Sequence, residues 1–416
     1  MIRRLRASVL FICLASLLAQ VALAGDSSAS LSLSQPHAAD QAGATPCPCP
    51  PQQAITPGSA LDWYEAWKKF KEDLERTTGT TLSLCLIETP QVALNGPAEG
   101  NVRNVFWWNL GLNQKLWSGA RLITNTRGGK GDGLHKLIDE KLSTNWMASE
   151  PDPLYVSHCL LEQKLWDDSV TLWLGKLDVD DYFDTNEVAS WNFLSYSLAR
   201  NPTVPCPWHA IGAVARYAPA EWLYLQAGVA DAQGSWTETG FRTAFHDEAY
   251  TVSMYEVGLR PKVNGRQGNY RFILWYDAEQ LDRVDDVGTE RDDAGFALGF
   301  DQALTDKVAA FFRYGCADEA IREIEHYWSL GAVRTGPFPS RPDDELAFGV
   351  SQGIMGQDYR DKNRSAPQET LVEVYYKIQV NPWLSIKPDL QVILNPGAER
   401  DEDVSVVAGV RMQLSL

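Results

Sequence analysis

Beyond its first 24 residues the chain contains no uninterrupted apolar run of about 18 residues, the length that an α-helix needs to cross a bilayer. This absence excludes a helical membrane protein. The one apolar run, over residues 9–19, follows three arginines and is succeeded by an A-x-A pattern ending at Ala24. A basic start, a short apolar centre and small residues at the end predict a secretory signal peptide over residues 1–24. The exported remainder is expected to be either soluble or a β-barrel.

Positive charge is also scarce. The whole chain carries a formal charge of −17, and removal of the three arginines in the signal peptide lowers this to −20. A surface this acidic repels the phosphate backbone of nucleic acids and the headgroups of anionic surfaces, so neither is expected as a main partner.

Motifs for metals and catalysis are missing or incomplete. The histidines show no pair at helical spacing, and the acidic run 178–184 lacks the Gly and the final ligand of an EF-hand, where Ala189 stands instead. The glycines near Gly128 are not followed by the K-[ST] of a P-loop. The G-V-S-Q-G of residues 349–353 matches a nucleophile elbow, but a polar loop follows where that motif needs a helix. We therefore expect no enzyme and no cofactor.

The cysteines outside the signal peptide show no redox or zinc spacing, although export permits disulfides. Cys85 and Cys159 lie within strand patterns and are expected to be inert, whereas Cys206 and Cys316 lie at strand ends and could pair. Connectivity is not fixed by the sequence for the set Cys47, Cys49, Cys85, Cys159, Cys206 and Cys316.

Three segments follow the signal peptide. Residues 25–60, rich in Pro and Ala, predict a linker that cannot bury a core. Residues 61–78 predict an amphipathic helix in the periplasm, because one face carries Trp63, Trp67, Phe70 and Leu74. Residues 79–416 change to a period-2 pattern and predict the main domain.

That domain contains sixteen candidate strands, each near the length of a tilted membrane strand. They are predicted at 81–88, 103–112, 115–125, 154–164, 169–177, 207–217, 221–230, 249–260, 268–278, 293–303, 306–315, 326–335, 344–352, 369–380, 383–394 and 404–416.

The connections between these strands alternate in length. Tight turns are expected at 113–114, 166–168, 219–220, 305 and 381–382, and long polar loops at 126–153, 179–206, 231–248, 279–292 and 353–368. This segregation predicts an all-β fold: a 16-stranded antiparallel transmembrane β-barrel with short periplasmic turns and long extracellular loops.

The two faces of the C-terminal strands agree with a barrel. In the final V-R-M-Q-L-S-L, one side is apolar through Leu416, and Arg411 and Gln413 lie on the other. A charge on the lipid side near the midplane would cost about 2–4 kcal/mol, so the polar side is expected to face a wet lumen. The last strand is expected to close the barrel against the first one.

Two stretches carry a family resemblance. The first reads W-L-G-K-L-D-V-D-D-Y-F-D-T-N-E-V-A and is followed by N-F-L-S; the second runs from E-T-L-V-E-V-Y-Y-K-I-Q-V-N-P-W-L-S-I-K-P-D-L-Q-V-I-L-N-P-G to the end of the chain. Both resemble the carbohydrate-selective porin family (OprB type), most strongly over residues 171–195 and 369–416. The resemblance implies an outer-membrane barrel that passes sugars by facilitated diffusion, without fixing which sugar. The D-W-Y-E-A-W start departs from the usual opening of the family.

Selectivity in such a pore must come from inward side chains and infolded loops. Strand alternation predicts a lumen-facing set suited to sugar hydroxyls and ring faces: Arg121, Arg216, Glu256, Arg271, Trp275, Arg313, Glu373, Lys377, Lys387 and Asp389. The acidic run just past one strand either folds in and narrows the pore or is a solvated loop. Its candidate residues are Asp178, Asp180 and Asp181, with Lys176 beside them.

The favoured hypothesis is a passive outer-membrane channel for mono- or oligosaccharides, bound to outer-membrane lipid as a monomer or a homotrimer. A general porin is the nearest alternative. A barrel lipid hydrolase that uses Ser351, and a soluble secreted protein that binds glycans, are the others.

Overall fold

The structure is a computed structural model, and it describes residues 62–149, 154–236, 238–245, 249–400 and 404–416. The predicted signal peptide and the predicted Pro/Ala-rich linker therefore lie outside the described residues. None of the helices in these ranges has both the length and the apolar character needed to cross a membrane.

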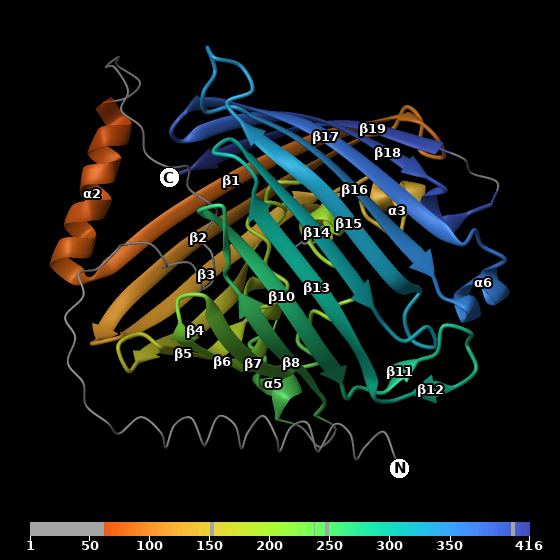
Figure 1. Cartoon of the computed structure of the whole chain (residues 1–416), viewed down its shortest axis with the longest axis horizontal. Helices are drawn as coiled ribbons and strands as arrows, with labels where there is room; N and C mark the ends of the chain where they lie inside the picture. Colours follow the sequence, from red (N-terminus) through yellow and green to blue (C-terminus); the bar gives the residue numbers. More distant parts are fainter. Residues whose placement is uncertain (1–61, 150–153, 237, 246–248, 401–403) are drawn as a thin grey trace. The chain divides into compact units, whose positions relative to one another are not determined.

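Sixteen strands pair side by side in one antiparallel sheet that closes on itself, which confirms the predicted barrel (Figure 1). They are β1 (Thr80–Asn95), β2 (Val102–Trp117), β3 (Ala120–Gly131), β4 (Tyr155–Leu165), β5 (Val170–Leu177), β6 (Ala210–Ala220), β7 (Leu223–Asp231), β8 (Thr251–Leu259), β10 (Arg266–Asp277), β13 (Asp293–Ala303), β14 (Val308–Cys316), β15 (Ile324–Thr335), β16 (Glu345–Met355), β17 (Gln368–Asn381), β18 (Leu384–Leu394) and β19 (Val404–Ser415). Three two-residue strands are accessory: β9 (Lys262–Val263), β11 (Leu281–Asp282) and β12 (Thr289–Glu290).

The barrel closes between β1 and β19, as predicted. Their register places Cys85 opposite Ser415, and the pairing reaches the last residue. The Leu84 amide donates to the Leu416 carbonyl at 3.0 Å, and the Leu416 amide donates to the Leu84 carbonyl at 2.8 Å. Neither strand therefore leaves an open row of backbone donors and acceptors.

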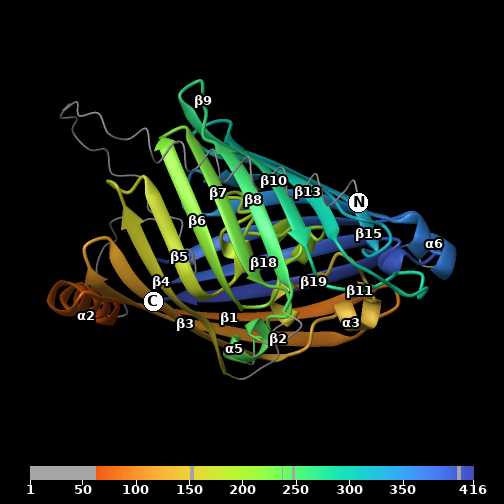
Figure 2. The same ribbon diagram turned by 90° about the horizontal axis from the view of Figure 1, so that it is seen from below.

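The two ends of the barrel differ in their connections. One, the short-turn end, has connections such as 118–119, 166–169 and 382–383; the other, the long-loop end, carries the loops 178–209 and 356–367. Helix α2 (Asp62–Thr78) and the C-terminus lie at the short-turn end, whereas α3 (His135–Ile138), α6 (Gln357–Asn363) and β11 lie at the opposite end (Figure 2).

Two predicted turns are in the wrong place. Gln114 pairs with both Thr80 and Leu122, so β2 runs through the predicted turn, and the chain reverses at residues 118–119 instead. Gly119 there has a φ of +72°, which favours glycine. The turn predicted at 219–220 likewise falls two residues later, because Ala220 still pairs with Leu223.

Helix α2 contacts the barrel through an edge-to-face pair of Trp63 and Trp383, whose ring centroids are 5.1 Å apart. Trp63 is still 44% exposed and Phe70 is 50% exposed, so the aromatic face of α2 is only partly covered by the described chain. The remaining helices are short: α4 (Tyr196–Ala199), α5 (Phe241–Ala244), and the 3₁₀ turns η1 (Trp146–Ser149), η2 (Val179–Asp181) and η3 (Pro396–Ala398).

The cysteine predictions are wrong in two respects. Cys85, expected to be inert, is disulfide-bonded. Cys206 and Cys316 are both free, so they do not pair with each other; the Cys206 thiol instead contacts the Asp178 carboxylate at 3.4 Å. Cys159 is free as expected and lies exposed on β4.

Candidate functional site

The inner face of the barrel carries nearly all the charged side chains predicted to lie there. Residues directly opposite each other on paired strands share a face, and Gly299 of β13 lies between Arg271 of β10 and Arg313 of β14. Beyond β15 and β16, the side chains of Glu373, Lys377, Lys387 and Asp389 share the inner face of β17 and β18. On the outer face, Val374, Leu390 and Met412 are 39%, 46% and 40% exposed, which agrees with a lipid-facing surface.

One connection of the long-loop end turns into the barrel. This lumen loop, residues 178–209 between β5 and β6, contains η2 and α4. Its apolar side chains Phe193 and Leu198 are fully buried and pack in one cluster with Phe311 and Tyr375 of the wall. The lumen loop therefore fills part of the lumen and narrows it.

Charged side chains of β17, β18 and β19 hold the tip of the lumen loop. The Glu373 carboxylate accepts hydrogen bonds from the amides of Leu194 at 2.6 Å and Ser195 at 2.9 Å. Arg411 donates to the carbonyls of residues 191 and 193 at 3.0 and 3.3 Å, and Lys387 donates to the carbonyl of residue 192. All these contacts are to main-chain atoms.

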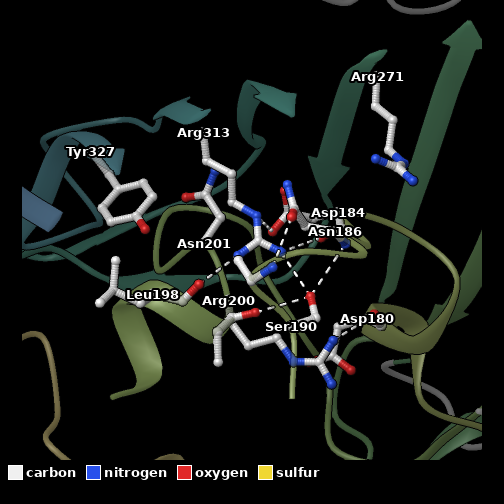
Figure 3. A network of polar contacts seen from close by, with 12 residues as sticks. Asp180, Asp184, Asn186, Ser190, Leu198, Arg200, Asn201, Arg271, Arg313 and Tyr327 are labelled. Atoms are coloured by element: carbon white, nitrogen blue, oxygen red, sulfur yellow. Dashed lines mark hydrogen bonds and ion pairs between the residues drawn. The ribbon is translucent and has the colours of Figure 1, made fainter. Parts of the chain in front are cut away.

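Arg313 of β14 joins three points along the lumen loop (Figure 3). Its guanidinium donates to the carbonyl of Leu198 at 2.9 Å, the carbonyl of Asp184 at 3.0 Å and the hydroxyl of Ser190 at 2.8 Å. The arginine is fully buried and lies 3.5 Å from the Asp184 carboxylate, so its charge is compensated where it is desolvated.

Glycines on the inner wall make room for the lumen loop. A Cβ added at Gly349 of β16 would come within 2.8 Å of both Leu198 and Phe193, and one at Gly315 of β14 would come within 2.0 Å of the Thr203 hydroxyl. Any larger residue at these positions would displace the loop from the wall.

A second lumen loop, residues 132–149 after β3, is anchored in the same way. Glu369 of β17 accepts from the amides of Lys141, Leu142 and Gly397, the shortest of these bonds being 2.6 Å. Burial, and then the negative charge of Glu369, raise the pKa of Glu140 on this loop to about 8. Glu140 therefore keeps its proton at neutral pH.

The acidic run at the start of the lumen loop is buried. Asp181 lies 3.0 Å from His158, Asp178 lies 3.3 Å from His209, and Asp180 lies 3.1 Å from Arg200. Burial and the charges of Asp180 and Asp181 raise the pKa of Asp178. Burial acts to raise the pKa of Asp181, but His158, Arg127 and Arg200 together outweigh it and hold that pKa below its usual range. The burial of Asp178 and Asp181 contradicts the solvated loop, and a direct part of the run in narrowing the pore remains a prediction.

The buried acidic run and the nearby Cys206 contain a set of possible metal ligands. Single ligand atoms of Asp178, Asp180 and Cys206 lie within 4.8 Å of one another. Arg127 lies 3.7 Å from both Asp178 and Asp181, and Arg200 also contacts the run, so the arginines already supply the counter-charge. We therefore assign no metal to this group.

Arginines on β3, on β6 and just after β8 make no contact in the described chain that anchors the lumen loop. Arg121 of β3 pairs with Glu162 through two hydrogen bonds of 2.7 and 3.2 Å and has a side chain that is 42% exposed. Arg216 of β6 and Arg260 after β8 are partly exposed. The guanidinium of Arg271, by contrast, is buried and pairs with Asp301 at 2.6 Å.

Several predicted residues lie elsewhere than in an open lumen. Lys176 shares a strand face with Leu172 and Leu174, so it points to the outside of the wall, where it donates to the carbonyls of Trp236 and Glu238. The prediction that Lys176 lines the pore beside the acidic run is therefore wrong. Trp275 faces inward but is 2% exposed and packs in a core cluster.

The other predicted residues face inward with protein partners. Glu256 accepts from the hydroxyl of Tyr224 at 2.5 Å and from the amide of Asp184 at 3.3 Å. Lys377 pairs with Glu345 at 3.2 Å, and Asp389 accepts from Gln391 at 2.9 Å. A contact between any of these side chains and a solute remains a prediction.

Sequence reasoning missed four residues that form arginine–ring contacts on the inner wall. Arg260 and Arg127 interact with rings, Arg260 with Tyr224 at 5.0 Å and Arg127 with Trp107 at 5.8 Å. Tyr224 and Trp173 are buried rings that contact lumen arginines. Period-2 alternation alone would have found Trp173, since it shares a face with Thr171 and not with Leu172.

The chain is similar to known proteins over most of this barrel. The model of the family described as "Carbohydrate-selective porin, OprB family" matches residues 152–416. Porin B of Pseudomonas aeruginosa is 27% identical over 239 residues, which cover 47% of this chain and 52% of that protein. Porin AaxA of Chlamydia felis is 24% identical over 267 residues, which cover 62% of this chain and 57% of that protein. The chain thus spans about half the length of the curated relatives it matches.

A solved structure has the same fold. The high-pH structure of Pseudomonas putida OprB superimposes with a TM-score of 0.77 at 20% identity, covering 84% of this chain and 97% of that one. The family comprises channels and not enzymes, and the predicted outer-membrane location is confirmed. This barrel, with its loops folded into the lumen, belongs to the OprB family of carbohydrate-selective porins.

Proposed function

We propose that this protein is a passive channel that admits mono- or oligosaccharides across the outer membrane. The observation that carries the proposal is the lumen loop, which is held inside the barrel by Glu373, Arg313 and Arg411 and narrows the passage. The carbohydrate-selective family to which the chain belongs supports the same function.

The side chains left accessible suit a sugar. Arg121 and Arg216 offer several directed N–H donors for hydroxyl oxygens. Trp191 of the lumen loop is partly exposed and packs edge-to-face on Trp146, with ring centroids 4.7 Å apart. An indole in this position can pack against the apolar face of a pyranose ring.

In this proposal the long-loop end faces the outside of the cell, and the short-turn end with α2 faces the periplasm. The loops that fold into the lumen then lie on the side from which the sugar enters. The protein works as a monomer or a homotrimer.

Planar-bilayer recording of the purified full chain tests the function. We expect a steady single-channel current that glucose blocks in a concentration-dependent manner, while an amino acid of similar size does not. Equal block by both solutes would favour a general porin. Absence of any current from folded protein would refute the proposal.

The lipid-hydrolase alternative finds no support at Ser351. This serine is fully buried, and its hydroxyl bonds to the hydroxyl of Ser197 at 2.7 Å. Among the described residues no histidine hydrogen-bonds it, so the general base that such a mechanism needs is missing.

A further inference from the structure

Two arginines on the β6–β8 wall have guanidinium groups with unused donors. The Nε of Arg216 donates to Gln226 at 2.6 Å, but no described residue accepts from its Nη atoms. No described carboxylate pairs with Arg260, whose backbone amide makes its one hydrogen bond in the described chain. Both guanidinium groups lie near the same ring: Arg216 is 4.6 Å and Arg260 is 5.0 Å from the centroid of Tyr224.

The ring that the two arginines share is held rigidly. Tyr224 lies against Gly258, where a Cβ would come within 2.0 Å of ring atoms, and its hydroxyl donates to Glu256 at 2.5 Å. Arg216 is also 5.7 Å from the ring of Trp173, whose indole N–H donates to Glu162 at 2.8 Å. Stacking on fixed rings positions the guanidinium groups before any ligand arrives.

The acids around this pair are already engaged. Glu256 accepts from Tyr224 and from the Asp184 amide, and Glu162 binds Arg121. Glu187 of the lumen loop is exposed and lies within electrostatic reach of Arg260. Glu256 and Glu187 thus balance the two arginines in charge, but no described acceptor uses the Nη atoms of Arg216 or the guanidinium of Arg260, so these N–H donors stay available to a ligand.

We propose that Arg216 and Arg260 form a binding site for the carboxylate or phosphate of an acidic sugar, which makes acidic sugars a preferred substrate class of this channel. This inference rests on the proposed function as a sugar channel. Guanidinium forks match the paired oxygens of a carboxylate or a phosphate, and such charge-assisted bonds are stronger than those to a neutral hydroxyl.

The test compares block of the single-channel current by glucose, glucuronate, glucose 6-phosphate and inorganic phosphate at constant ionic strength. We expect the two acidic sugars to reach half-block at concentrations about tenfold below that of glucose, as one additional charged hydrogen bond would give. The two acidic sugars distinguish a carboxylate preference from a phosphate preference.

Matched variants test whether the preference for acidic sugars depends on the two arginines of the β6–β8 wall. In the double variant Arg216→Gln, Arg260→Gln the half-block concentration of glucose, divided by that of each acidic sugar, should fall close to one. Glu187→Gln should increase the ratio, because it removes the competing acid. Arg266→Gln is the control: this arginine pairs with Asp306 at 3.2 Å at the short-turn end, and its loss should leave the ratio unchanged.

Three results would overturn the proposal while leaving the sugar channel intact: no preference for acidic sugars over glucose in the wild type, a preference that survives the double variant, or block by inorganic phosphate that equals block by glucose 6-phosphate. A conducting pore that no sugar blocks would instead refute the function on which the proposal rests.

Discussion

The carboxylate of Glu373 is expected to be the main anchor of the lumen loop, and Glu373→Ala should release the tip of that loop. The side chain is fully buried and accepts two main-chain N–H bonds, from Leu194 at 2.6 Å and Ser195 at 2.9 Å. A hydrogen bond to a charged group contributes about 1.5–3 kcal/mol. The substitution also deprives the buried Arg411 of a counter-charge. We therefore expect the docked loop to lose about 3–5 kcal/mol, as when one member of a buried ion pair is removed.

Such a loss would shift the loop from docked to frequently detached. The measurable results are a larger mean single-channel conductance, more current noise, and faster entry of disaccharides into proteoliposomes. Glu373→Gln keeps one acceptor oxygen and should show an intermediate effect. Glu345→Gln is the matched control, because Glu345 lies on the adjacent strand and pairs with Lys377 at 3.2 Å, away from the loop.

The proposed role of Glu373 would be wrong if Glu373→Ala kept the wild-type single-channel conductance, current noise and size limit for disaccharides. The barrel should stay folded in either case, since the ladder of β16, β17 and β18 does not involve this side chain. Retention of the heat-modifiable band on a denaturing gel checks that point.

Three further predictions concern other parts of the barrel. Since the pKa of Glu140 rises from 4.5 to about 8, the folded carboxyl stays protonated where the unfolded one ionises, and the stability of the second lumen loop falls as pH rises between these values. In Glu140→Gln the stability of this loop should no longer fall with pH. The measurement is the rate of protease cleavage within the loop as a function of pH. Gly349→Ala should widen the pore because its Cβ meets Leu198, at a cost of about 1–3 kcal/mol, whereas Gly299→Ala, with neighbours at 3.9 Å, should leave conductance unchanged. Leu416→Asp should lower outer-membrane assembly and Leu416→Phe should be tolerated, since Leu416 closes the ladder with Leu84; normal amounts of the Asp variant in the outer-membrane fraction would contradict this.

Much of the fold could be predicted because the bilayer imposes a simple rule on each strand. Apolar and polar side chains must alternate, and this assigned Val374 to the outside and Glu373 to the inside correctly. The same alternation over residues 171–177 places Lys176 with Leu174 on the outer face, and not in the pore. The β7–β8 loop covers it there and supplies carbonyl acceptors, which allows a lysine on that face.

The role of the inner charges could not be predicted in the same way. Alternation predicts that Glu373, Lys387 and Arg313 face the lumen as candidates for a sugar, and in the structure each binds the backbone of the lumen loop. Which loop folds inward is decided by packing between segments over a hundred residues apart, such as Leu198 against Gly349. Local periodicity carries no information about such contacts.

The anchors of the lumen loop have a consequence for which parts of this chain can change. Glu373 holds two amides, while Arg411 and Lys387 hold carbonyls, so these three anchors recognise the path of the main chain at the tip of the loop and not the side chains there. A substitution of Glu187, whose side chain is exposed, is therefore expected to leave the course of the loop unchanged. In this chain the side chains that face a solute can therefore change while the frame that shapes the pore stays in place.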